Sequence, residues 1–128
     1  MQVEIRTVED IVISRSVAKE MARETGFGIV DQTKIATVIS ELARNMIKYA
    51  GEGMLRIVVI EDSNRKGVEI TCDDGGPGIE NIALALKEGY STSRGLGMGL
   101  PGAKKLMDEF VIESEVGKGT RVVVRKWL

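Results

Sequence analysis

Two kinds of hydrophobic pattern follow one another along this chain, and their order limits the folds that it can adopt. In the first half, hydrophobic residues recur every three or four positions, as on one face of a helix. After residue 53, alternation of hydrophobic and polar residues is the commoner pattern, as in half-buried strands. The predicted strands are 3–8, 54–61, 67–73, 110–116 and 120–127, and the predicted helices are 9–24, 31–50, 80–88 and 100–109. Long helices beside hairpin-connected strands favour an α+β fold, a two-layer sandwich with helices on one face of a mostly antiparallel sheet.

Size, charge and cysteine content narrow the class of protein. The 128 residues are expected to form a single domain, 1–128. A net charge of −1 gives no basic surface for nucleic acid or an anionic membrane. No stretch approaches the roughly 18 apolar residues of a membrane span, and we expect no signal peptide. The single cysteine, Cys72, allows no internal disulfide and suits a reducing compartment, so we expect a cytoplasmic protein.

The chain contains no histidine, and this absence excludes several chemistries. Phosphorylation of a histidine of its own, Ser-His-Asp hydrolysis and metal sites with histidine ligands are all ruled out. The Walker A pattern GxxxxGK[ST] is also absent, which excludes a P-loop interpretation.

The second predicted helix combines a broad hydrophobic face with a narrow polar stripe. Asp31 is its expected N-cap. Glu41, Asn45 and Lys48 are spaced i, i+4 and i+7, which puts a carboxylate, an amide and a cation in one line at the border between core and solvent. Taken alone, such a stripe is more often an ordinary solvated helix face than a site.

A carboxylate followed by glycines ends the strand 67–73. If the alternation of that strand continues, Asp74 points to the same side as the hydrophobic residues, where a carboxylate needs a partner. Gly75, Gly76 and Gly78 follow, and glycines let the backbone approach a ligand closely. Taken alone, this pattern is more often a tight turn with an exposed Asp cap.

Two further glycine-rich segments lie downstream. Residues 95–101 read GLGMGLP and directly precede a predicted helix. Backbone N–H groups in such a loop, together with a helix N-terminus, attract phosphate, although a flexible connection is an equally good interpretation. Residues 117–120 read GKGT and, taken alone, indicate a hairpin turn.

The order of these signals is more specific than any one of them. Together they resemble the N box, the G1 box, the G2 box and the terminal Gly-Thr motif of the GHKL ATPases, a superfamily that includes gyrase, Hsp90, histidine kinases and MutL. The matching residues are Glu41-x-x-x-Asn45, Asp74-x-Gly76-x-Gly78, Gly95-x-Gly97-x-Gly99 and Gly117-x-Gly119-Thr120. The resemblance implies the GHKL (Bergerat) ATP-binding fold.

Further segments resemble the RsbT group of bacterial switch kinases, which act in the stressosome and are similar to the anti-sigma-factor kinases RsbW and SpoIIAB. These segments are GFG at 26–28, ISELARN at 39–45, YSTS at 90–93, GMGLPG at 97–102, LMDEF at 106–110 and KWL at 126–128. We expect no room for the transducer domain of gyrase, Hsp90 or MutL, nor for the histidine-bearing helix pair of histidine kinases. A stand-alone kinase is therefore favoured.

The resemblance also implies roles for individual residues. Asp74 would accept a hydrogen bond from the adenine amino group, with Thr120 close by behind the base. Asn45 would bind Mg²⁺ through its amide oxygen, and Glu41 would orient or deprotonate the attacking hydroxyl. The remaining implied nucleotide-binding residues are Gly76, Gly78, Ile79, Gly95, Gly97 and Gly99, the last three in a lid over the phosphates. Positive charge to neutralise the phosphates could come from Lys48, Arg44 or Arg94, and the sequence does not distinguish among them.

The function implied by the resemblance is that of an ATP-dependent protein serine/threonine kinase. It would phosphorylate STAS-domain proteins of a stress-signalling complex and, once released, bind and activate a PP2C-type phosphatase. Two alternatives stay open. One is an anti-sigma factor with serine kinase activity that sequesters an RNA polymerase sigma subunit, and the other is a non-catalytic, nucleotide-gated binding module. We expect neither a nucleic-acid nor a membrane partner.

Overall fold

The computed structural model describes residues 1–78 and 99–128, so the predicted helix 80–88 and nearly all of the loop after it lie outside the described residues. The described strands are β1 (Gln2–Ile5), β2 (Gly53–Asp62), β3 (Arg65–Asp74), β4 (Glu109–Glu115) and β5 (Gly119–Trp127). The described helices are α1 (Val8–Thr25), α2 (Ile29–Ala50) and α4 (Gly99–Leu106). Each agrees in type with the sequence prediction for its segment.

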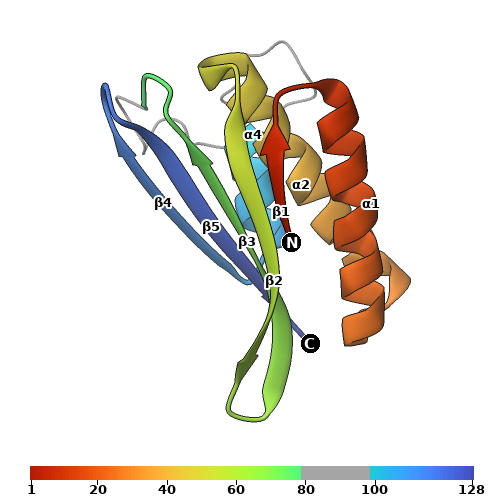
Figure 1. Ribbon diagram of the computed structural model, residues 1–128. Helices are drawn as coiled ribbons and strands as arrows, with labels where there is room; N and C mark the ends of the chain where they lie inside the picture. Colours follow the sequence, from red (N-terminus) through yellow and green to blue (C-terminus); the bar gives the residue numbers. More distant parts are fainter. Residues whose placement is uncertain (79–98) are drawn as a thin grey trace.

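The strands form one antiparallel sheet in the order β1-β2-β3-β5-β4. Figure 1 shows α1, α2 and α4 together on one face of this sheet, with the other face uncovered by any described helix. The expected α+β two-layer sandwich is therefore confirmed. β3 lies at the centre of the sheet, and its C-terminal end carries Asp74.

The first strand ends earlier than the sequence predicted, because a helix cap interrupts it. The Thr7 side chain accepts a hydrogen bond from the Asp10 backbone N–H, and the Asp10 carboxylate accepts one from the Thr7 N–H at 3.0 Å. This reciprocal capping box satisfies backbone donors that a helix start leaves unpaired, so the chain turns into α1 at Val8. The predicted strand 3–8 is corrected to Gln2–Ile5.

The turn between the two long helices corrects a second expectation. Gly26 ends α1 with a φ of +117°, and its N–H and that of Phe27 donate back to the last turn of the helix. The N-cap of α2 is Gly28, so Asp31 lies within the first turn, where its charge still complements the helix dipole. The buried Gln32 side chain donates to the Phe27 carbonyl at 2.8 Å, which fixes the turn against α2.

The core lies between the helices and the inner face of the sheet. The hydrophobic stripe predicted for the second helix is buried in α2, with the exception of half-buried Ala50. Among the described residues, nine hydrophobic side chains larger than alanine have no exposed surface: Ile5, Ile35, Val38, Ile39, Leu55, Ile57, Val68, Ile70 and Val124. Burying a side chain of this size stabilises the fold by roughly 1.5–3 kcal/mol. The core therefore fixes α2 against β3, the two elements that carry Glu41, Asn45 and Asp74.

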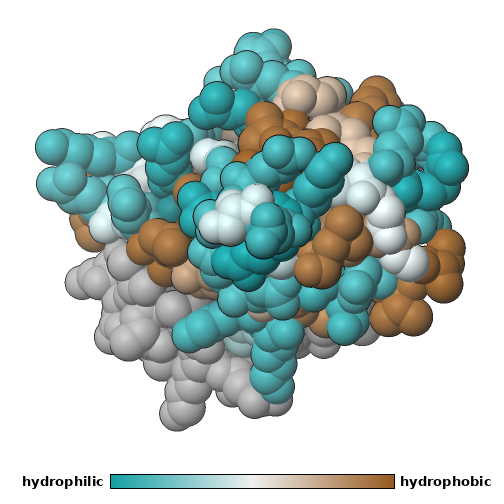
Figure 2. Space-filling view, turned by 90° about the horizontal axis from the view of Figure 1, so that it is seen from below, coloured by the Kyte–Doolittle hydropathy of each residue, from teal (hydrophilic) through white to brown (hydrophobic). Residues whose placement is uncertain are grey.

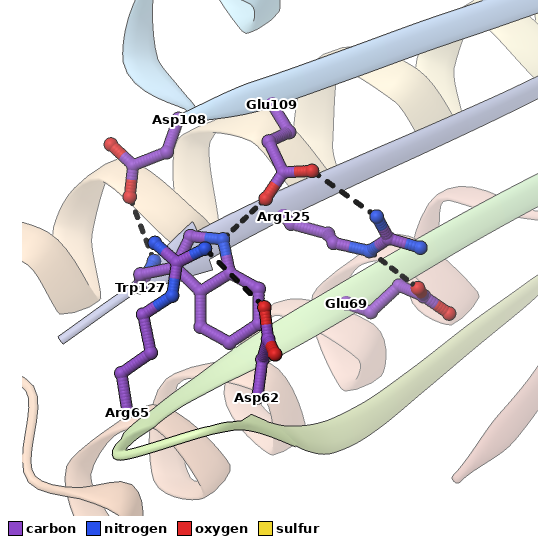
Figure 3. Close-up of polar contacts among 7 residues, drawn as sticks. All are labelled: Asp62, Arg65, Glu69, Asp108, Glu109, Arg125 and Trp127. Atoms are coloured by element: carbon purple, nitrogen blue, oxygen red, sulfur yellow. Dashed lines mark hydrogen bonds and ion pairs between the residues drawn. The ribbon is translucent and has the colours of Figure 1, made fainter.

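The outer face of the sheet carries a polar cluster near the β2–β3 hairpin, shown in Figure 3. Arg125 donates to Glu69 at 2.8 Å and to Glu109 at 3.1 Å, so it joins β5 to both neighbouring strands. The Trp127 indole N–H also donates to Glu109, and the Arg65 guanidinium carbon lies 4.0 Å from the centre of the indole ring. This cluster fixes the C-terminal strand at the end of the sheet opposite Asp74.

Figure 2 views the molecule from the end at which the β2–β3 hairpin lies. Hydrophilic residues cover most of this face, and hydrophobic residues occur among them in small separate groups. Scattered hydrophobic side chains of this kind are normal on protein surfaces. Within the described part of the chain, no helix is long and apolar enough to cross a membrane.

Candidate functional site

The polar stripe of α2 emerges where the helix passes from core to solvent. Glu41 and Asn45 are half-buried, and Lys48 is exposed, as the helical spacing predicts. The Asn45 side-chain amide makes no hydrogen bond with the described residues. Lys48 instead lies with its Nζ 5.4 Å from the centre of the Tyr49 ring. The stripe therefore presents an unengaged amide between a carboxylate and a cation.

Glu41 is paired with a neighbour on its own helix. Arg44 Nη1 lies 2.7 Å from Glu41 Oε1, in an i, i+3 ion pair. The Glu41 side chain is 16% exposed, whereas that of Arg44 is 57% exposed. The carboxylate is thus sheltered and oriented, while the guanidinium remains accessible from solvent.

Asp74 ends β3 on the inner face, as the alternation of the strand predicts. Cys72, two residues earlier on that face, is 3% exposed. The Asp74 Oδ1 atom accepts a hydrogen bond from the Gly76 N–H at 2.9 Å, which orients the carboxylate. A Cβ on Gly76 would lie 2.6 Å from the Cβ of Ala50, so the loop after β3 touches the C-terminal end of α2. Asp74 and the polar stripe of α2 consequently border the same region.

The Cys72 thiol beneath this carboxylate is poorly suited to chemistry. Burial raises the pKa of the thiol far above its usual range, and the charges of Asp73 and Asp74 act in the same direction. A thiol held in its protonated form is neither a nucleophile nor a metal ligand. Cys72 therefore acts as a small core residue.

A row of oxygen-bearing side chains crosses three strands at this end of the sheet. Asp74 of β3 pairs directly with Thr120 of β5, and Thr120 pairs directly with Ser114 of β4. Directly opposed residues of an antiparallel pair project from the same face, so the three side chains form one row. Ser114 Oγ lies 2.8 Å from Thr120 Oγ1. Sequence reasoning expected Thr120 near Asp74 but missed Ser114, which only the register around the 117–118 turn could have indicated.

Glycines allow the loop after β3 and the β4–β5 hairpin to pack closely. Gly78 has a φ of +80°, and a Cβ there would overlap the Glu115 carbonyl. Gly119 has a φ of +111°, and a Cβ there would overlap the Asp74 carbonyl. The Gly117 N–H donates to the Pro77 carbonyl at 2.8 Å. The hairpin segment 117–120 therefore also buttresses the loop that follows Asp74.

An open hollow of about 290 Å³ lies at this end of the sheet. Its lining comes from β3, β4, β5 and the turn between β4 and β5, includes Asp74, Ser114 and Thr120 beside outer-face residues such as Asp73 and Arg121, and contains no residue of α2. Four expected nucleotide-binding residues lie outside the described residues: Ile79, Arg94, Gly95 and Gly97. Their expected roles stay predictions. Gly99 is the first residue of α4, whose first turn also contains Pro101, as predicted. The structure thus brings together Asp74, Gly76, Gly78 and Thr120 at one end of the sandwich. The C-terminal end of α2 contacts this group at Ala50, and Asn45 and Glu41 lie further back along the same helix.

The sequence of the chain matches a known ATPase family. Residues 30–128 match the model of the histidine kinase-, DNA gyrase B- and HSP90-like ATPases. Two solved structures share the fold over nearly the whole chain at low identity. The mycobacterial sensor histidine kinase MprB has a TM-score of 0.57 at 14% identity, covering 99% of this chain and 96% of its own. The catalytic domain of the histidine kinase ThkA has a TM-score of 0.55 at 20% identity, and the match covers 98% of this chain and 95% of the ThkA domain.

Curated relatives are more similar in sequence. The serine/threonine-protein kinase RsbT of Bacillus subtilis (strain 168) is 50% identical, covering 98% of this chain and 95% of its own. The anti-sigma F factor of Clostridium kluyveri is 35% identical, covering 89% of each chain. The chain belongs to the histidine kinase-, DNA gyrase B- and HSP90-like ATPase family. Within that family it is a serine/threonine kinase of the RsbT type.

Proposed function

We propose that the chain binds Mg-ATP between the C-terminal half of α2 and the Asp74 end of the sheet. There it transfers the γ-phosphate to a serine or threonine of a STAS-domain protein. The observation that carries this proposal is the Asp74–Thr120 pair at the end of β3 and β5, beside the polar stripe of α2. In this arrangement the Asp74 carboxylate and the Thr120 hydroxyl recognise the adenine base. The polar stripe of α2 lies toward the phosphates.

The base is recognised by the Asp74 carboxylate. One of its oxygens accepts the Gly76 N–H, which leaves the other to accept a hydrogen bond from the adenine amino group. Gly76 packs on Ala50 and Gly78 on the β4–β5 hairpin, which holds the loop after Asp74 in place beside the proposed base. A 6-aminopurine matches this site because a carboxylate can only accept hydrogen bonds.

Mg²⁺ is the second ligand of the proposed site. Its coordination suits one protein oxygen combined with nucleotide phosphates and water, since Mg²⁺ is seldom held in an all-protein cage. Within the described residues, no group of three or more His, Cys, Asp or Glu could hold a metal ion unaided, which agrees with this mode. The amide oxygen of Asn45, which makes no hydrogen bond with the described residues, would hold the ion, and the ion would neutralise phosphate charge.

Glu41 positions the attacking group. The hydroxyl oxygen of the substrate bonds to the γ-phosphorus, the bond from that phosphorus to the β–γ bridging oxygen breaks, and ADP leaves. The hydroxyl proton passes to Glu41, which the ion pair with Arg44 orients. Lys48 and Arg44 contribute positive charge toward the phosphates, and Gly95, Gly97 and Gly99 keep the phosphate-binding role that the resemblance implies.

The similarity to RsbT supports the protein partners that we propose. The kinase phosphorylates STAS-domain proteins of a stress-signalling complex, and the released kinase binds and activates a PP2C-type phosphatase. Phosphate adds about −1.5 to −2 charges to the STAS side chain. Beside Glu41 and the nucleotide phosphates, that charge repels the kinase and favours its release. We further propose that the chain works in the cytoplasm.

The proposal is tested by incubating the chain with labelled ATP, Mg²⁺ and STAS-domain proteins encoded near its gene. We expect label on a serine or threonine of the STAS protein, and its loss in Glu41→Gln. Glu61→Gln, an exposed substitution on β2 away from the site, is the matched control. Absence of transfer by the unaltered chain would refute the kinase mechanism on STAS substrates.

The second candidate function is an anti-sigma factor, favoured by the 35% identity to the anti-sigma F factor of Clostridium kluyveri. A pull-down with sigma subunits separates the two functions. Stable, nucleotide-dependent capture of a sigma subunit would favour the anti-sigma function, whereas capture of a PP2C-type phosphatase would favour the switch kinase.

A further inference from the structure

One line of exposed residues on α1 is hydrophobic at the start of the helix and basic further along. It consists of Val8, Val12, Arg15 and Lys19, which we call the α1 stripe. Their spacing of i, i+4, i+7 and i+11 places them along a single line of the helix surface. Val8 is 69% exposed and Val12 is 54% exposed, and both cations are exposed as well. The α1 stripe therefore offers solvent a hydrophobic surface that continues into a positively charged one.

The two cations of the α1 stripe have no ion-pair partner among the described residues. Other basic residues on the two long helices do have one, because Arg23, Lys34 and Arg44 each pair with a carboxylate three residues earlier. Arg15 and Lys19 instead lie one turn apart, and like charges at i and i+4 destabilise a helix. Carboxylates on a partner would relieve this repulsion. The α1 stripe is thus complementary in charge to an acidic surface.

The hydrophobic end of the α1 stripe lies at the same end of the sandwich as Asp74. Arg6, just before the cap of α1, pairs at 3.0 Å with Glu52, which lies between α2 and β2. The next residues of β2 include Met54, which pairs with Asp73 beside Asp74. Figure 1 shows α1 and α2 side by side and antiparallel, so the start of α1 lies beside the C-terminal half of α2.

We propose that the α1 stripe is the docking surface for the STAS-domain substrate, which presents hydrophobic side chains bordered by carboxylates to it. This inference rests on the proposed kinase function. The axes of packed helices are about 8–10 Å apart, and a domain of about 100 residues has a radius of gyration of about 13 Å. A domain seated on α1 can therefore reach the polar stripe of α2 with a serine or threonine. The two valines would be buried in the interface, and the cations would form its charged rim.

An anionic membrane is the other surface that a basic stripe beside hydrophobic residues could bind. Helices that lie on a membrane bury Trp, Phe or Leu in it. The sequence of α1 contains none of these residues, and the α1 stripe has only two valines. A protein surface is therefore the favoured occupant.

The test measures phosphate transfer by Arg15→Glu to a STAS-domain protein encoded near the gene. The introduced carboxylate can pair with Lys19 at i, i+4, so the variant should be at least as stable as the unaltered chain. The KM for the STAS protein should rise about tenfold, with kcat and ATP affinity unchanged. Val12→Ser should also raise this KM, because it removes hydrophobic area at a similar helix propensity. Added salt should raise the KM less in Arg15→Glu than in the unaltered chain.

Arg56→Glu is the matched control, because it changes the net charge by the same amount. Arg56 is exposed on β2, and its neighbours Leu55 and Ile57 are buried against the helices, so it faces the other side of the sheet from α1. Its KM for the STAS protein should equal that of the unaltered chain. The proposal is overturned if Arg15→Glu leaves this KM unchanged, or if Arg56→Glu raises it equally.

Two further measurements separate this inference from the proposed function and from membrane binding. If the unaltered chain transfers no phosphate, the kinase mechanism fails, and calorimetry with the STAS protein still tests the docking surface. Binding that Arg15→Glu weakens would support the docking surface alone, whereas absence of binding would overturn both proposals. Sedimentation with phosphatidylserine vesicles should leave the unaltered chain in solution. Retention on the vesicles that Arg15→Glu abolishes would assign the α1 stripe to a membrane and overturn the proposal.

Discussion

Arg44 and Glu41 form an ion pair of 2.7 Å along one face of α2, with the carboxylate sheltered and the guanidinium exposed. Ion pairs between residues one turn apart on a helix add little stability, typically about 0.3–0.5 kcal/mol. The more useful consequence of this pair is geometric. One carboxylate oxygen is held by Arg44, so the carboxylate keeps a fixed orientation one turn before Asn45.

Glu41→Gln should impair phosphate transfer far more than ATP binding. The change keeps the size of the side chain and its capacity to accept a hydrogen bond, but it removes the basic carboxylate. General-base help is typically about a hundred- to ten-thousandfold, so the transfer rate should fall by that order. Single-turnover transfer and ATP calorimetry on the same preparation check this. Transfer at the unaltered rate would make Glu41 a structural residue.

Asp74→Asn should weaken ATP binding, and Asp73→Asn is its matched control. Asp73 is the preceding residue, its side chain lies on the other face of β3, and it forms an ion pair of 3.5 Å with Arg121. A charge-assisted hydrogen bond contributes roughly 1.5–3 kcal/mol, so Asp74→Asn should lower affinity about ten- to a hundredfold. Asp73→Asn should change it little. Equal losses in the two variants, with circular dichroism unchanged, would contradict the assignment of Asp74 to the base.

Gly76→Ala should destabilise the fold, whereas Gly75→Ala should not. A Cβ on Gly76 would lie 2.6 Å from Ala50 Cβ and 3.1 Å from Asp74 Oδ1, but a Cβ on Gly75 would meet no atom within 4 Å. Overpacking typically costs about 1–3 kcal/mol, and open surface substitutions stay within about 0.5 kcal/mol. Urea unfolding of both variants measures the difference. If Gly76→Ala is as stable as Gly75→Ala, the contact between this loop and α2 is not tight.

Local patterns were sufficient to predict the layers of the fold and much of the site. The 3.6-residue period in α2 and the two-residue alternation in β3 fixed which faces are buried. From these faces the positions of Glu41, Asn45 and Asp74 at the border of the core could be predicted. Caps were harder to predict. The boundary of β1 depended on the reciprocal bonds of Thr7 and Asp10, which compete with strand formation.

Relationships between distant strands could not be predicted from local patterns. The sequence does not state that β5 inserts between β3 and β4, and this order is what makes Asp74, Thr120 and Ser114 one row. The resemblance to GHKL proteins predicted that Thr120 lies near Asp74. Ser114 belongs to no motif, so its position beside Thr120 could be recognised only from the strand register. The Glu41–Arg44 ion pair could have been predicted from helical spacing, because residues i and i+3 are neighbours on a helix surface.

The Cys72 thiol should be unreactive in the folded protein. Its pKa is raised far above the usual range, first by burial and then by the two neighbouring aspartates, so almost no thiolate exists at neutral pH. Labelling with an aromatic disulfide reagent at pH 8 should be slow in buffer and rapid in urea. Fast labelling of the folded chain would show that the inner face of β3 opens readily. ATP should slow labelling further if it stabilises the Asp74 end of the sheet.

Glu109 should make the stability of the fold depend on pH. The hydrogen bond from Trp127 lowers the pKa of this carboxyl below its usual value of 4.5, and the hydrogen bond and charge of Arg125 act in the same direction. Because the folded pKa lies below the unfolded one, the unfolded chain binds more protons, and stability must fall as pH falls. The contribution is present above about pH 4.5 and is lost as the pH passes down through the folded pKa.

Glu109→Gln removes that titration but keeps an acceptor for the indole. Thermal unfolding of this variant should therefore depend less on pH between about 5 and 3 than that of the unaltered chain. Trp127→Phe should act similarly, since it removes the donor that lowers the pKa most, and should also destabilise the fold at every pH because the contact with Arg65 weakens. Glu61→Gln, on the exposed end of β2, should leave the pH profile as it is. If Glu109→Gln and the unaltered chain lose stability in parallel as the pH falls, other carboxylates, such as Asp10 in the capping box, control the acid transition.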